Sequence, residues 1–332
     1  MATATSTAWT RASAELFSEG SQDLMWKILI ITSQVGDRSK ALANAFRQRG
    51  CEVWLTPIEA IRFDSTGRSG LFIPGLETDL PDAVLVCSMG AGTFEAITRR
   101  LGILHALRAL GVPVWNSAHA IERCVDKSMT TFLLQQAGLA TPATFTVEGL
   151  DEARVIADRE LRNGSLVLKP LFGAQGKGVR LISKMEELPA PEEVADTYYL
   201  QRYIPRHGPP FSDIRVFVCA GRVVEMMIRR GNDWVTNVQR GAVPEVVPIA
   251  MRERLADLAI RATRVVETDF AGVDIVPAAD GSLQVIEINS MPAWAGLQTV
   301  ARIDIGVAIV EAMLALLEDT AKPVFLQTPL PA

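Results

Sequence analysis

The stretch AGVDIVPAADGSLQVIEINS, residues 271–290, has the pattern of a β-hairpin. Its Asp280-Gly281 dipeptide favours a two-residue type I′ turn, because both central residues of that turn need a positive φ. A turn at this point places Asp274 directly opposite Glu287 in the paired strands. Asn289 lies two residues beyond Glu287 and therefore on the same face. The hairpin thus brings two carboxylates and one amide together.

Two carboxylates opposed in an apolar pair of strands destabilise it unless a cation lies between them. Asp274, Glu287 and Asn289 offer only oxygen ligands, which suits Mg²⁺ (or Mn²⁺) that shares its remaining positions with phosphate and water. We therefore predict a metal site of one or two ions. The alternative needs no metal: Asp274 pairs with an arginine and Glu287 faces solvent.

A second signal is the stretch LVLKPLFGAQGKGVRLI, residues 166–182, with glycines 173, 176 and 178 between two expected strands. Glycine lets successive backbone N–H groups turn toward one point and cradle an anion. A strand follows the loop, whereas Walker and dinucleotide motifs open a helix. The loop is therefore predicted to be a flap over phosphates, with an ordinary hairpin turn as the alternative.

Cations accompany this loop. Lys169 lies in an apolar strand and needs an anionic partner there. Lys127, in an expected helix, fits a phosphate contact or a solvated face equally well. Arg215, Arg229, Arg230 and Arg240 lie in or beside apolar strands. Their guanidinium groups suit a transferred phosphate or an acidic substrate, and surface charge along a sheet edge is the alternative for at least one of them.

The composition limits the classes of protein. The 332 residues, 48% hydrophobic and 21% charged, predict two or three domains with a buried core and exclude wholesale disorder. A net charge of −5 argues against a nucleic-acid surface. No uncharged stretch is a convincing membrane span. Four separated cysteines and three histidines favour neither a zinc site nor disulfides, and indicate a reducing, cytoplasmic setting.

The order of the expected elements predicts an α/β protein. Buried runs at 27–33 and 83–87, helices at 39–49 and 94–110 and a short strand at 112–116 indicate a parallel sheet. A single long helix is expected at 121–137. Short strands with glycine turns then predict antiparallel sheets, at 166–169, 179–182, 198–201, 214–219 and 223–228. Helices at 252–267 and 305–317 complete the chain.

In this order and spacing, the motifs resemble those of ATP-grasp ligases, and among these the RimK-like alpha-L-glutamate ligases. The resemblance runs from about residue 27 to residue 317. It is carried by NS at 116–117, CVDK at 124–127, VLK at 167–169, GAQGKG at 173–178, QRYI at 201–204, DIR at 213–215, RR at 229–230, NVQRG at 237–241, GVDI at 272–275 and EINSMP at 287–292.

The resemblance implies an ATP-grasp fold of three parts. A pre-ATP-grasp α/β domain would span residues 26–118, a small central lid 119–204, and a C-terminal antiparallel-sheet domain with the magnesium site 205–320. A flexible extension, 1–25, and a tail, 321–332, would flank them. ATP would lie between the lid and the C-terminal domain.

The resemblance also implies roles for individual residues. Asp274, Glu287 and Asn289 would bind Mg²⁺, in agreement with the hairpin, and Arg215 and Arg240 would be catalytic, facing the acyl phosphate or the incoming amino acid. The hinge at 201–204 would read adenine. The nucleotide contacts would be Lys127, Lys169, Gly173, Gln175, Gly176, Lys177, Gly178, Gln201, Arg202, Tyr203, Ile204 and Asp213.

The implied reaction joins a carboxylate to an amine through an acyl phosphate, with ATP as the phosphoryl donor and L-glutamate or another amino acid as the amine. The ending at 289–298 resembles ligases of pterin and furan one-carbon cofactors. Arg202 stands where relatives carry an acidic residue, which leaves adenine recognition to backbone groups, and Val235 stands where they often carry arginine, which leaves the acceptor open.

Two other functions fit the same motifs: a nucleotide-binding module without catalysis, and a ligase for another acceptor, such as one that makes D-Ala-D-Ala-like dipeptides. Neither nucleic acid nor membrane is an expected partner, and a homo-oligomer is compatible with the sequence. The opposed carboxylates favour the ligase over the module, because a mere binder has little need for them.

Overall fold

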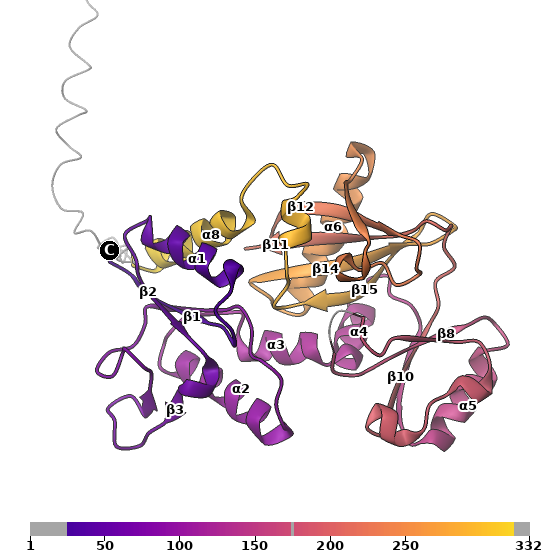
Figure 1. The fold of residues 1–332 in the computed structure, drawn as a ribbon, viewed down its shortest axis with the longest axis horizontal. Helices are drawn as coiled ribbons and strands as arrows, with labels where there is room; N and C mark the ends of the chain where they lie inside the picture. The colour runs from indigo at the N-terminus through magenta and orange to yellow at the C-terminus, as the bar shows by residue number, and fades with distance from the viewer. Residues whose placement is uncertain (1–24, 174–175, 322–332) are drawn as a thin grey trace, which may run out of the picture.

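The computed structural model describes residues 25–173 and 176–321 (Figure 1). The predicted extension and tail, apart from residues 25 and 321, lie outside the described residues, as does Gln175. Three larger sheets and one two-stranded ribbon are arranged along the chain. The predicted mixed class with an antiparallel C-terminal sheet is confirmed. No helix in the described ranges combines the length and apolarity needed to cross a bilayer.

The first sheet is parallel and has the strand order β2-β1-β5-β6. Its inner strand β1 has four consecutive buried apolar residues after Lys27, as expected for a parallel sheet covered on both faces. The strands are β1 (Lys27–Ile31), β2 (Glu52–Thr56), β5 (Ala83–Val86) and β6 (Val114–Trp115), with helices α1 (Asp37–Arg47) and α2 (Phe94–Ala109) and the ribbon β3 (Arg62–Phe63) and β4 (Leu71–Phe72).

The prediction of a single helix at 121–137 is wrong, because the structure has two helices in this region. The chain forms α3 (Ala118–Val125) and α4 (Lys127–Gln136), and Asp126 between them has ψ 100°. The Asp126 carboxylate accepts hydrogen bonds from the backbone N–H groups of Ser128, at 2.9 Å, and Met129, at 3.2 Å. This N-cap starts a new helix, so that Lys127 becomes its first residue.

The central sheet is antiparallel, with the order β7-β10-β8-β9. Its strands are β7 (Thr144–Glu148), β8 (Leu166–Lys169), β9 (Arg180–Ile182) and β10 (Thr197–Arg202). Helix α5 (Leu150–Glu160) covers one face, and its Ala153 and Ala157 pack with Leu168 and Tyr198. Neither α5 nor β7 was predicted from the sequence. In α5, small alanines supply the fully buried contacts in place of a strong apolar stripe.

The C-terminal sheet has the order β13-β12-β11-β14-β15, and all its neighbours are antiparallel. Helix α6 (Ile249–Val265) packs on it, and α7 (Ala295–Gln298) and α8 (Ile305–Ala321) follow. The strands are β11 (Phe211–Cys219), β12 (Arg222–Gly231), β13 (Val243–Val246), β14 (Phe270–Pro277) and β15 (Leu283–Asn289).

The β14–β15 hairpin confirms one prediction and corrects another. Gly281 has φ +81°, but Asp280 has no positive φ, so the turn is not type I′. The Gly281 N–H donates to Ala278 O at 2.9 Å, and the loop is one residue longer than predicted. Val276 therefore pairs with Gln284, whereas a two-residue turn at Asp280-Gly281 would pair it with Val285. An irregularity between Asp274 and Ile275, which leaves Ile286 of β15 without a partner, shifts the register back, so that Asp274 does face Glu287.

Asn116 joins the first sheet to the C-terminal sheet. Its buried amide Nδ2 donates to Phe270 O at 2.7 Å and Ser290 O at 2.5 Å. Its Oδ1 accepts from Asp269 N at 2.6 Å and Phe270 N at 3.1 Å. All the hydrogen-bonding capacity of one side chain is therefore used to hold the start of β14 and the end of β15.

An apolar core also crosses this junction. Helix α8 lies beside α1 although it ends the described chain (Figure 1). Ile309 and Met313 of α8 share one cluster with Ile30, Phe46 and Phe217, which belong to β1, α1 and β11. The first sheet therefore depends for one of its faces on the far end of the chain.

We expect Asn116→Ala to destabilise the protein by about 3 kcal/mol, because buried backbone groups of β14 and β15 lose their partners. Denaturation by urea, followed by circular dichroism, measures this change. Asn163→Ala, at an exposed position, is the control. Equal stability of the two variants would contradict the role given to Asn116.

Asp269 gives the stability a pH dependence. Burial raises its pKa to about 7, against the lowering effect of Arg108, whereas the pKa of an aspartate in the unfolded chain is about 3.9. The folded state therefore binds the extra proton, and its stability falls as the pH rises from 4 to 7. We expect Asp269→Asn to stabilise the protein by about 1–2 kcal/mol more at pH 8 than at pH 5, measured by urea denaturation. A gain of the same size at both pH values would argue against this shift.

Candidate active site

A cleft lies between the central sheet and the C-terminal sheet. Strands β8 and β10 and helix α4 line it on one side, and β11, β12, β14 and β15 on the other. It brings together most of the residues singled out in the sequence: Lys127, Lys169, Gly173, Gly176, Lys177, Gln201, Arg202, Tyr203, Ile204, Asp213, Asp274 and Glu287.

The other predicted residues surround the cleft. Arg215 and Asn289 lie in its strands β11 and β15. Arg240 donates to Asp233 at 2.7 Å and to Gly176 O at 3.5 Å, which places it beside the glycine loop. Gly178 has φ +72°, and a Cβ there would stand 2.8 Å from Pro170 Cγ, so only glycine fits.

A row of charged side chains crosses the C-terminal sheet at this cleft. The register sets Arg229 of β12 against Asp213 of β11, and Arg215 of β11 against Asp274 of β14. Glu287 of β15 comes next. Because Asp213 and Arg215 are two residues apart, both lie on the same face. The strand register alone therefore assembles the row.

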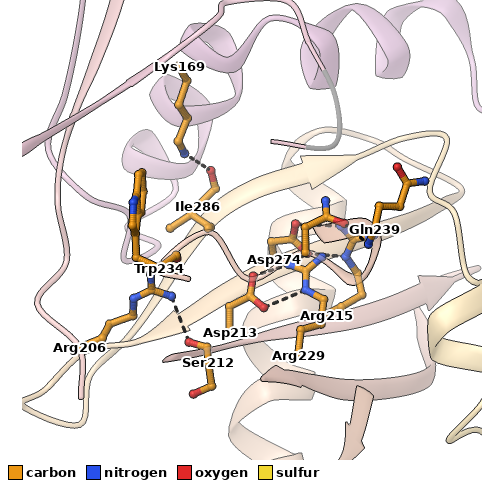
Figure 2. A network of polar contacts seen from close by, with 11 residues as sticks. Lys169, Arg206, Ser212, Asp213, Arg215, Arg229, Trp234, Gln239, Asp274 and Ile286 are labelled. Carbon is orange, nitrogen blue, oxygen red and sulfur yellow. Dashed lines mark hydrogen bonds and ion pairs between the residues drawn. The ribbon is translucent and has the colours of Figure 1, made fainter. Parts of the chain in front are cut away.

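The row is tied together by ion pairs (Figure 2). Arg229 donates to Asp213 through Nε, at 2.8 Å, and through Nη2, and it also reaches Asp274 Oδ1 at 3.1 Å. Arg215 binds Asp274 through Nε and through Nη2, the latter at 2.8 Å. Burial acts to raise the pKa of Asp274, but the two guanidinium groups hold it below the ordinary value. Asp274 is thus an ionised carboxylate with two cationic partners.

Two lysines face Glu287 from the other side of the cleft. Lys169 Nζ donates to Gln201 Oε1 at 2.7 Å and lies 3.4 Å from Ile286 O. Burial lowers the pKa of Lys169 to about 8, and the negative charge of Glu287 opposes this effect. Lys127 Nζ donates to Leu171 O at 3.1 Å and Gly173 O at 3.3 Å. The carbonyl partners leave both ammonium charges available to an anion.

The segment 201–204 offers a ligand mainly backbone groups, because the Gln201 and Arg202 side chains are engaged elsewhere. The Gln201 amide is buried and donates to Thr144 Oγ1 at 3.0 Å while it holds Lys169. The backbone N–H groups of Arg202 and Tyr203 donate to Ala143 O and Ser165 O, respectively. Among the hydrogen bonds of the described residues, none uses the Ile204 N–H. That group remains for a ligand.

Arg202, which stands where relatives carry an acidic residue, has its side chain bound to helix α5. Its Nε donates at 2.6 Å to Glu160, a carboxylate of α5 that is only 3% exposed. The guanidinium therefore ties the hinge strand to α5. An arginine at position 202, in place of an acidic residue, therefore still leaves the backbone groups at 202–204 in position for a ligand.

Glu287 and Asn289 fit a divalent cation. They share a face of β15, and the amide oxygen of Asn289 can join the Glu287 carboxylate as a neutral oxygen ligand; the amide nitrogen Nδ2, a donor that cannot bind a cation, has no hydrogen-bond partner in the described residues. Within those residues no three His, Cys, Asp or Glu side chains form a metal-binding group, so the amide oxygen would be needed. Asp274 has the arginine partners of the alternative considered above, and its role as a ligand stays a prediction.

Three further residues line the cleft and were not predicted from the sequence: Arg206, Trp234 and Thr236. Arg206 follows the predicted hinge by two residues, and this proximity was the available signal. Trp234 and Thr236 lie in the loop after β12, where no periodic pattern marks them. Their positions depend on contacts between distant segments.

Comparisons with known proteins identify the family of the chain. A model of the RimK-like ATP-grasp domain matches residues 124–313. The tetrahydromethanopterin:alpha-L-glutamate ligase of Methanococcus maripaludis is 34% identical over 209 residues, which cover 61% of this chain and 70% of that protein. A probable alpha-L-glutamate ligase of Vibrio cholerae is 31% identical over 291 residues, which cover 82% and 90%.

The fold has solved counterparts as well. The ATP-grasp ligase PsnB, complexed with a minimal precursor, Mg and ADP, superposes with a TM-score of 0.65 at 20% identity. The match covers 88% of this chain and 98% of that one. At this level of identity the likeness concerns the fold.

We expect Arg229→Met to destabilise the protein by about 3–5 kcal/mol, because Asp213 loses its bidentate partner while it remains buried. Adding Asp213→Asn should recover part of this loss by removing the unpaired charge. Guanidinium denaturation of the single and double variants measures both effects, with Arg254→Met on the exposed side of α6 as control. No recovery in the double variant would contradict the ion-pair explanation.

Proposed function

The chain belongs to the RimK-like ATP-grasp family, and on that premise we propose that it is an ATP-dependent ligase that adds L-glutamate to a carboxylate acceptor. The observation that carries this proposal is the opposition of Lys127 and Lys169 to Glu287 across one cleft. Such a site offers cations to phosphate oxygens and oxygen ligands to a metal within the same space.

In this proposal the nucleotide lies along the cleft. The free N–H of Ile204 and the carbonyls of the hinge would bind the adenine edge. The two lysines are placed to bind phosphates, beside the glycine loop. Because their present partners are neutral carbonyls, an anionic ligand can replace those partners without leaving a carboxylate unpaired.

A divalent cation belongs to the same proposal. Glu287 and Asn289 would hold Mg²⁺, which when bound neutralises phosphate charge and so favours phosphoryl transfer. Whether Asp274 also becomes a ligand depends on Arg215 and Arg229, which now hold both of its oxygens. We propose Glu287 and Asn289 as the primary ligands.

The chemistry follows from the charges. A carboxylate oxygen of the acceptor attacks the γ-phosphorus of ATP, ADP leaves, and an acyl phosphate forms. The amine of glutamate then attacks the acyl carbon, phosphate leaves, and an amide remains. Lys127 and Lys169 stabilise the negative charge that develops on the phosphoryl oxygens. We assign Arg215 and Arg240 to the acidic groups of the reactants, since both border the cleft.

The proposal also concerns the chemical class of the acceptor. The similarity to a tetrahydromethanopterin:alpha-L-glutamate ligase supports a pterin acid, and the 289–298 segment supports a pterin or furan one-carbon cofactor. We further propose that the units at 26–118, 119–204 and 205–320 act as predicted from the sequence, and that the protein works in the cytoplasm.

The direct test incubates the protein with ATP, Mg²⁺ and L-glutamate, with and without a carboxylate-bearing pterin. We expect ADP release that depends on the acceptor, and a product heavier by one glutamyl residue in the mass spectrum. Tight ATP binding with no ADP under any condition would favour a non-catalytic module. Use of D-alanine in place of both reactants would favour the dipeptide ligase.

We expect Glu287→Gln to abolish amide formation while the protein stays folded, because the amide cannot supply the negative charge that a cation needs. ADP release measures turnover, and circular dichroism reports the fold. Glu253→Gln, on the exposed face of α6, is the control and should keep full activity. Unchanged turnover in Glu287→Gln would rule out the metal assignment.

A further inference from the structure

Arg206 ties three segments together at the hinge end of the cleft. It lies between β10 and β11, just after the hinge. Its Nη1 donates to Ser212 O at 3.1 Å, at the start of β11, and its Nη2 donates to Trp234 O in the loop after β12. Figure 2 shows the side chain between these two partners. One guanidinium thus fixes the loop that carries Trp234.

Aromatic rings surround this guanidinium. Its central carbon is 5.9 Å from the ring centroid of Tyr203 and 5.6 Å from that of Phe211. The rings of Tyr203 and Trp234 meet edge to face, with centroids 5.9 Å apart and an interplanar angle of 81°. We call Tyr203, Arg206, Phe211 and Trp234 the aromatic corner. All of its members except Phe211 line the cleft.

Arg206 differs from the neighbouring arginines in the partners of its guanidinium group. Arg202, Arg229 and Arg240 each pair with a carboxylate, whereas no carboxylate in the described part of the chain lies within ion-pair distance of Arg206. Two of its five N–H donors are used on carbonyl oxygens. The remaining donors and the positive charge are therefore available to a ligand in the cleft.

The position of the corner limits which part of a nucleotide it can meet. Lys127 and Lys169, with Glu287, occupy the end of the cleft suited to phosphates. Tyr203 directly precedes Ile204, whose N–H is free for the adenine edge. The corner therefore lies at the nucleoside end, where flat rings offer stacking surfaces and a guanidinium can donate to ribose hydroxyls.

We propose that Arg206 is a positioning residue for the nucleoside part of ATP: it holds Trp234 against Tyr203, and the two rings form a wall for adenine and ribose. This inference rests on the proposed function, because it takes ATP as the ligand. It adds the residues that distinguish a nucleoside phosphate from phosphate alone.

The test compares two probes, Mg-ADP and Mg-tripolyphosphate, by calorimetry. For Arg206→Met we expect ADP affinity to fall roughly tenfold, because Trp234 is no longer held against Tyr203 and the aromatic wall is lost, while tripolyphosphate affinity changes less than about twofold. General damage to the fold would weaken both probes alike. Arg222→Met, at an exposed position in β12, is the matched control and should bind both probes normally.

Trp234→Phe gives an independent readout that keeps an aromatic ring. We expect ADP to change the tryptophan fluorescence of the wild-type protein and this change to be largely lost in Trp234→Phe. Unaltered ADP affinity in Arg206→Met, equal weakening of both probes, or a full fluorescence change in Trp234→Phe would each overturn the inference. Failure of the wild-type protein to bind ADP at all would instead refute the proposed function.

Discussion

Asp274 and Glu287 are held opposite each other in the hydrogen-bonded strands β14 and β15, and this enforced pairing of like charges constrains the residues around it. The two carboxylates receive their cations from different sides. Arg215 and Arg229, within the same sheet, hold Asp274. Glu287 is left to face the lysines of the other side of the cleft. The same repulsion therefore explains both a closed ion-pair row and an open, cation-lined site.

The opposition of these carboxylates was predictable because strand alternation and one turn dipeptide are local properties of the sequence. The details of the turn were not: the loop has an extra residue and the strand has a bulge, and the two effects cancel at Asp274. The break at Asp126 was missed for a similar reason. Apolar spacing continues through that residue, whereas its extended backbone and its side-chain hydrogen bonds show that one helix ends and another begins.

The members of the candidate site were largely predictable, whereas their partners were not. Lys169 and the neighbouring glycines stand out locally, since a cation in an apolar strand and clustered glycines are unusual. The pairing of Arg229 with Asp213, or of Arg202 with Glu160, joins residues far apart in the sequence, and many acids could have served. Arg206 escaped notice because its partners are backbone carbonyls, which carry no residue identity.

The packing of α8 on α1 has a consequence for the order of folding. During synthesis the first sheet emerges early, yet Ile30 and Phe46 acquire their neighbours Ile309 and Met313 only when almost the whole chain has been made. Until then an apolar face of this unit stays exposed to water, which favours association with other chains. We expect the nascent protein to need protection by a chaperone over this interval, and the arrival of α8 to end that need.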